Sequence, residues 1–80
     1  MNYAPRPTVL RWLQIGQREG ASHMLLVEDA LADETVPVYI SPGDNLAYKI
    51  SRFKNIHSMQ MIAIFDLLSD LEEQLDLVFS

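Results

Sequence analysis

The chain has 80 residues, with six lysine or arginine residues, eleven aspartate or glutamate residues and a formal net charge of −5. The absence of cysteine excludes a disulfide framework and a thiolate zinc site, and it favours a reducing, cytoplasmic setting. A hydrophobic share of 49% is typical of a folded protein, and the length predicts a single domain, residues 1–80, with a thin margin of stability.

The first predicted element is a helix over residues 8–19. Thr8 is a good N-cap, apolar residues follow it at helical spacing, and Gly20 is a natural C-terminal stop. The short apolar run "SHMLLVED" that comes next predicts a largely buried strand over residues 23–28.

A second strand is predicted at "VPVYIS", residues 36–41, which is rich in β-branched and aromatic residues. Because Pro37 cannot donate to a ladder, this strand should be at a sheet edge, or Pro37 should sit at its beginning. The acidic connection "DALADET" between the two strands is long for a tight hairpin but short for a crossover helix. The two strands are therefore predicted to be antiparallel.

The stretch "SPGDN" is typical of a turn, after which Asp44 or Asn45 can cap a helix with Leu46, Ile50 and Phe53 on one face. A longer helix is predicted over about residues 58–78. Its apolar residues recur in steps of three and four, at Met61, Ile64, Leu68, Leu71, Leu75 and Val78. The predicted fold is thus α+β, a small α-β-β-α-α domain with a two-stranded antiparallel ribbon and a long C-terminal helix.

The negative charge is concentrated in this last helix. Residues 1–54 contain all six basic residues and six acidic ones, whereas residues 55–80 contain five acidic residues and no lysine or arginine. Carboxylates near a helix C-terminus oppose the helix dipole, so helix stability does not explain them. Two interpretations stay open: a solvated face that keeps the helix soluble, or a rim that attracts a basic partner.

The predicted helix is longer than the ribbon, so its second half is expected to extend past the domain with an apolar ridge to bury. That ridge, with its acidic rim, is the candidate partner-binding site. Its residues are Asp70, Leu71, Glu73, Leu75, Asp76, Val78 and Phe79. The ridge can also pair with a second copy, so a homo-oligomer, with a dimer favoured, is a further expectation.

No motif in the sequence indicates catalysis, a cofactor or a metal. The acidic stretch "EDALADE" lacks the ligand spacing of a calcium loop, and His23 and His57 have no cysteine nearby. Ser22 precedes His23, but neighbours on a strand point to opposite faces, so we expect no nucleophile and base pair there. The charge layout also lacks the basic face of a nucleic-acid binder, and no apolar run reaches the ~18 residues of a membrane span.

Residues 11–45 contain "RWLQIGQREG", "GASHML", an acidic connection, and "PVYI" before a Pro-Gly turn. In these features the chain resembles a set of small uncharacterised proteins encoded by bacteriophages and in proteobacterial genomes. The resemblance implies a small phage or prophage accessory protein, and such proteins commonly bind a host factor. It implies no activity for any residue.

These observations lead to a functional expectation. We expect a non-enzymatic accessory protein that acts in the cytoplasm, that of the host if it is phage-encoded, and modulates a host protein through its acidic C-terminal helix. Two alternatives stay open, namely an acidic mimic of nucleic acid that inhibits a host enzyme, and a structural protein whose role is self-association.

Overall fold

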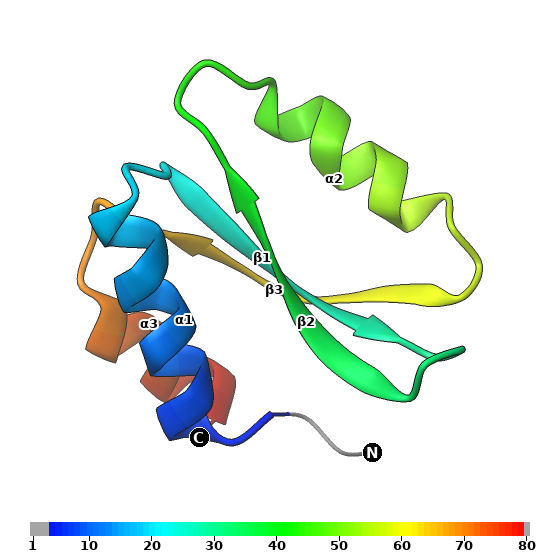
Figure 1. Ribbon diagram of the computed structural model, residues 1–80, viewed down its shortest axis with the longest axis horizontal. Helices are drawn as coiled ribbons and strands as arrows, with labels where there is room; N and C mark the ends of the chain where they lie inside the picture. Colours follow the sequence, from blue (N-terminus) through cyan, green and yellow to red (C-terminus); the bar gives the residue numbers. More distant parts are fainter. Residues whose placement is uncertain (1–3, 80) are drawn as a thin grey trace.

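Figure 1 shows a computed structural model of the protein, which describes residues 4–79. The elements in chain order are α1 (Arg6–Arg18), β1 (His23–Asp29), β2 (Glu34–Ile40), α2 (Leu46–Lys54), β3 (Met59–Asp66) and α3 (Leu71–Phe79). The α+β class is confirmed, with the order α-β-β-α-β-α. No helix within residues 4–79 has the length and apolar character needed to cross a membrane.

The three strands form one antiparallel sheet in the order β2-β1-β3. The predicted antiparallel pairing of the first two strands is confirmed, with a register that runs from His23 opposite Ile40 to Asp29 opposite Glu34. Pro37 lies in β2, which is an edge strand, as its missing N–H requires. The sheet therefore has two edges of different character, one with a proline and one, β3, without.

The predicted helix over residues 58–78, and with it the two-stranded ribbon, is wrong. Residues 59–66 form β3, and a turn separates this strand from α3, which begins at Leu71. The run "MQMIAIF" is rich in residues that suit a pleated, half-buried surface, and its pairing with β1 completes the sheet. The apolar steps of three and four run across a strand, a turn and a helix, and they do not form one buried face, since Leu68 in the turn is 85% exposed.

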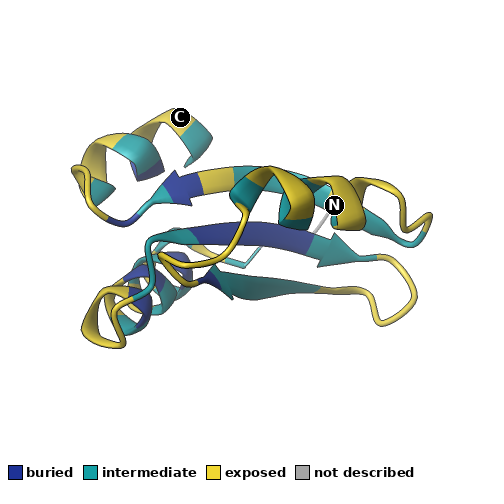
Figure 2. Ribbon diagram, turned by 90° about the horizontal axis from the view of Figure 1, so that it is seen from above, coloured by how far each residue is buried: buried dark blue, intermediate teal, exposed yellow. Residues whose placement is uncertain are grey.

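Helices cover both faces of the sheet, with α1 and α3 on one face and α2 on the other (Figure 1). Seen from above, β1 is the most deeply buried strand (Figure 2), because it has a neighbour on each side and helices on both faces. Its side chains alternate between two cores. Met24 and Leu26 join the α1 and α3 side, whereas Leu25 and Val27 join the α2 side.

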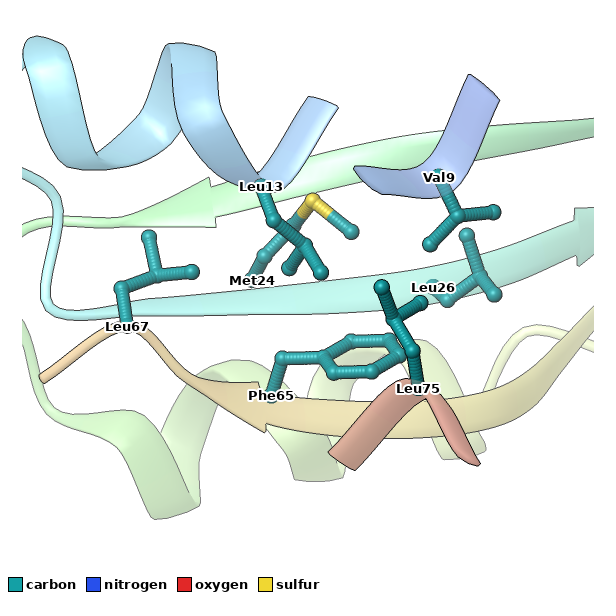
Figure 3. Close-up of a cluster of buried hydrophobic side chains, with 7 residues drawn as sticks. All are labelled: Val9, Leu13, Met24, Leu26, Phe65, Leu67 and Leu75. Carbon is teal, nitrogen blue, oxygen red and sulfur yellow. The ribbon is translucent and has the colours of Figure 1, made fainter. Parts of the chain in front are cut away.

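The larger core lies between the sheet and the helices α1 and α3 (Figure 3). Its buried residues are Val9, Leu13, Met24, Leu26, Phe65, Leu67 and Leu75. The smaller core beneath α2 has Leu25, Val27 and Ile40 as its buried residues, and α2 itself contributes only half-buried side chains. Asn45 caps α2 through a hydrogen bond from the N–H of Tyr48, which was one of the two caps predicted.

The C-terminal helix belongs to the body of the domain. Leu75 is completely buried, and Leu71, Val78 and Phe79 pack against the same core. The expectation that the second half of this helix extends past the domain is therefore wrong. A helix of nine residues is short enough to rest along its whole length on α1 and β3.

Candidate functional site

Most of the C-terminal acidic residues have local partners, and the first of these is the backbone of α3. Because α3 begins at Leu71, Asp70 precedes it, and its Oδ1 atom accepts the N–H of Glu73 at 3.3 Å. Glu72 and Glu73 lie in the first turn, where the helix dipole favours negative charge. The expectation that these carboxylates oppose the dipole is thus reversed for the first turn, and helix stability does account for part of the acidic cluster.

Arg6 at the start of α1 neutralises two further acidic side chains. Its Nη2 atom donates to Glu72 Oε2 at 2.7 Å and to Asp76 Oδ1 at 3.0 Å, and these bonds raise the pKa of the Arg6 guanidinium. These two ion pairs tie the N-terminal end of α1 to α3, and they give two carboxylates a partner within the chain.

Gln74 fastens α3 to the end of β3. Its Oε1 atom accepts the backbone N–H of Asp66 at 2.8 Å, and its Nε2 atom donates to the carbonyl oxygens of Asp66 at 2.9 Å and Asp70 at 3.1 Å. The side-chain amide therefore takes up both backbone groups of Asp66, as a neighbouring strand would.

The Asp66 carboxylate shapes the turn between β3 and α3. It accepts the N–H of Leu68 at 2.9 Å and the hydroxyl of Ser69 at 3.0 Å. These two bonds, with a smaller contribution from nearby His23, lower the pKa of Asp66, so its carboxylate stays ionised. The turn directs two consecutive leucines in opposite ways, because Leu67 is buried in the core and Leu68 is 85% exposed.

A cavity of about 310 Å³ lies beside this turn, at the end of the sheet where β1 begins and β3 ends. Three connections and the last turn of α1 form its wall. The lining residues are Gln17, Gly20, Ala21, Ser22, Pro42, Leu67 and Leu68. Most of this wall is apolar, and Leu68 stands at it with its side chain largely in solvent.

The wall of the cavity is held by several hydrogen bonds. Gln17 Nε2 donates to the carbonyl of Leu67 at 2.9 Å, and the N–H of Leu67 donates to the carbonyl of Ser22 at 3.0 Å. Gly16 allows α1 to pack closely against Leu67 and Tyr39, because a Cβ at Gly16 would lie 2.8 Å from both Leu67 Cδ1 and Tyr39 Cε1. Hydrogen bonds thus join the parts of the wall that come from α1, from the start of β1 and from the end of β3.

Acidic residues predominate in the chain segments that contribute the lining of the cavity. Four carboxylates, those of Glu19, Asp44, Asp66 and Asp70, stand within two positions along the chain of a lining residue, against one arginine, Arg18. The segments that form the apolar wall therefore have an excess of negative charge.

Burial, and then the charge of Glu19, raises the pKa of the Tyr39 hydroxyl, which donates to the carbonyl of Trp12 at 2.7 Å.

Ser22 and His23 contact each other, contrary to the sequence prediction. Ser22 lies just before β1, so strand alternation does not separate the two side chains, and Ser22 Oγ is 2.9 Å from His23 Nδ1. The serine hydroxyl also donates to the carbonyl of Ile40 at 3.2 Å. A hydroxyl has one proton, so a bond that donates it to Ile40 leaves Ser22 as the acceptor from His23. In that arrangement the serine is a structural link and lacks the base that a nucleophile needs.

The predicted partner-binding residues separate into two groups. Asp70, Glu73 and Asp76 are exposed, although Asp70 caps α3 and Asp76 pairs with Arg6. Leu75 is buried, and Leu71, Val78 and Phe79 are half-buried against the core. The apolar members of the predicted set thus have an ordinary role in the packing of the domain.

Sequence reasoning missed Leu68 and the cavity. A signal was available in "DLLSD", where Asp66, Ser69 and Asp70 are typical of a turn followed by a helix N-cap. A break at that point exposes one of the two leucines. The loops that line the rest of the cavity are far apart in the sequence, so no local pattern brings them together.

Within residues 4–79 no group of three or more His, Cys, Asp or Glu side chains is arranged to hold a metal ion. Comparisons with protein families, with curated proteins and with solved structures found no match to this chain.

Proposed function

We propose that this chain is a small non-enzymatic accessory protein that binds another protein through the cavity beside Leu68. The observation that carries the proposal is the exposure of Leu68, 85%, at the wall of a mostly apolar cavity. The hydrogen-bonded turn holds the Leu68 side chain in solvent. A partner that covered this side chain would remove its apolar surface from water, which is favourable.

The charge around the cavity indicates the chemistry of the partner. Four nearby carboxylates against one arginine favour a segment with lysine or arginine residues beside an apolar side chain that enters the cavity. Such a partner would meet Leu68 with its apolar side chain and Asp66, Asp70 and the other carboxylates with its basic ones. The resemblance to phage proteins makes a host protein, met in the host cytoplasm, the partner that we propose.

The alternative function, mimicry of nucleic acid, needs a row of carboxylates that are not neutralised within the chain. Arg6 neutralises two of the acids of α3, Glu72 and Asp76. Fewer unpaired charges are left along the helix, and this supports protein binding in preference to mimicry.

Peptide titration followed by NMR tests the proposal. The probes are basic peptides with a single leucine or phenylalanine, added to the ¹⁵N-labelled protein at low salt. In the wild type we expect chemical-shift changes at the amides of Gln17, Ala21, Ser22 and Leu68. These changes should be smaller at higher salt and absent in Leu68→Asn. Shifts confined to other surfaces, or no response to any peptide of this class, would overturn the proposal.

A matched control is available at the other end of the sheet. Leu31, in the turn between β1 and β2, is 86% exposed and so offers the same apolar area as Leu68, away from the cavity. Leu31→Asn should leave the peptide response unchanged. Equal losses in both variants would show that general surface hydrophobicity, and not the cavity, is responsible.

A further inference from the structure

The two edges of the sheet differ in how they resist the addition of another strand. β2 contains Pro37, which has no N–H to offer, and begins with the charged Glu34. β3 has neither proline nor charge from Met59 to Phe65. Exposed sheet edges usually carry prolines, charges or bulges that prevent pairing with another chain, and of these β3 has only a bulge, which leaves Ile62 without an opposite residue in β1.

Gln74 shows which backbone groups of β3 point away from the sheet. Its amide bonds the N–H and the C=O of Asp66, so these two groups face outward and not toward β1. In an antiparallel ladder the direction alternates with each residue, and the register between Asp66 and Ile64 is regular. The N–H and C=O of Ile64 therefore face outward as well, beyond the reach of the cap that Gln74 provides.

The side chain of Ile64 is also incompletely covered. Ile64 lies opposite Leu25, so it is on the face of the sheet that α2 covers, yet it is 45% exposed. Its exposed side chain and its outward backbone groups lie at one point of the edge. A strand placed alongside would satisfy the backbone groups and bury part of the side chain.

The segments on either side of β3 carry opposite charges. The helix before it, α2, contains Lys49, Arg52 and Lys54 and no acidic residue. From Asp66 onward the five charged residues are all acidic. Both α2 and α3 pack against β3, on opposite faces of the sheet, so these charges lie on the segments that flank the β3 edge.

We propose that β3 pairs antiparallel with β3 of a second copy, with Ile64 opposite Ile64 at a two-fold axis. In this register Ile62 of each copy comes to lie beside Asp66 of the other, so it replaces Gln74 in the bonds to that residue. The two outward N–H groups then donate to the two outward carbonyls, and the isoleucine side chains cover each other. An antiparallel arrangement sets the basic end of β3 in one copy near the acidic end in the other. The net charge of −5 opposes self-association elsewhere, whereas this edge is uncharged and its flanks are complementary.

Ile64→Pro tests the pairing directly, because it gives β3 the same protection that Pro37 gives β2. The outward N–H of Ile64 makes no ladder bond with β1, so its removal should spare the fold, and circular dichroism checks this. Sedimentation equilibrium should show wild-type protein approaching twice the monomer mass of 9.1 kDa as concentration rises. Ile64→Pro should stay monomeric, and Ile64→Val, which keeps the N–H and the branched side chain, should dimerise.

The wild-type protein supplies a second measurement that needs no variant. Hydrogen exchange at the Ile64 amide should slow as protein concentration rises, while exchange in the turn near Leu31 should not change. A wild-type chain that stays monomeric at the concentrations used for NMR overturns the proposal. So does a folded Ile64→Pro variant that dimerises as wild type does, or an Ile64 amide whose exchange is independent of concentration.

Discussion

The side-chain amide of Gln74 binds the backbone N–H and C=O of Asp66, and so takes the place of one residue of a fourth strand. This relationship joins α3 to the sheet and ends the open edge of β3 at Asp66. Gln74→Leu should lower the free energy of unfolding by about 1–3 kcal/mol, since the three hydrogen bonds of the Gln74 side chain are lost. Urea denaturation measures the change, and Gln14→Leu, at an exposed position of α1, is the control that should change little.

Leu75 should behave as a core residue. This residue of α3 is completely buried against α1 and the sheet, so Leu75→Ala should cost about 2–5 kcal/mol of stability. Leu68→Ala removes the same atoms from an exposed side chain and should change stability by no more than about 0.5 kcal/mol. Similar losses in the two variants, measured by thermal unfolding, would contradict the burial described for α3.

Gly16 sets the distance between α1 and the cavity wall. A methyl group there would meet Leu67 and Tyr39 at 2.8 Å, so Gly16→Ala should destabilise the protein by about 1–3 kcal/mol. Gly43 has open space around it, and Gly43→Ala is the matched control with a small effect expected. If both alanines were equally tolerated in urea denaturation, the close contact would be absent.

The turn after β3 should weaken in acid. The pKa of Asp66 is lowered in the folded state, so its carboxylate contributes stability above the ordinary pKa of 3.8. That contribution is lost as pH falls through the lowered folded value. Asp66→Asn should reduce the pH dependence of unfolding in this range. An unchanged pH profile in the variant would show that the bonds to Leu68 and Ser69 do not hold the carboxylate.

Salt should loosen the contact between α1 and α3. Arg6 bonds Glu72 and Asp76 in an exposed position, where added salt screens the attraction. Arg6→Gln should therefore lower the thermal midpoint at low salt and have little effect at high salt. Arg11→Gln, on the same helix but with no described ion pair, should show no such difference. A salt-independent loss in the first variant would point to packing in place of charge.

The sequence predicted the first half of the fold well, because its signals are local. Gly20 and Pro37 mark a helix end and an edge strand without reference to distant residues, and both lie where the structure requires them. The second half was misjudged because Met61, Ile64 and Leu75 share a helical spacing that only long-range pairing with β1 can overrule. Alternation and helical periodicity coincide in short apolar runs, so the pattern alone did not separate them.

The candidate site was predictable only in its charge. The acidic excess near α3 is visible in the sequence, but its use for capping, ion pairing and turn formation depends on where the helix begins. The cavity joins Gln17, Pro42 and Leu68, which approach one another only when the sheet forms. Tertiary contact of this kind leaves no trace in the local sequence.

Parallel affinity capture tests whether Leu68 and its cavity bind a basic protein. Tagged wild type, Leu68→Asn and Leu31→Asn are compared in a bacterial lysate at low and moderate salt, with the captured proteins quantified by mass spectrometry. We expect wild type and Leu31→Asn to retain a basic protein and Leu68→Asn to lose it. Higher salt should reduce the amount of this protein that is captured. Capture of the same proteins by all three variants would contradict it.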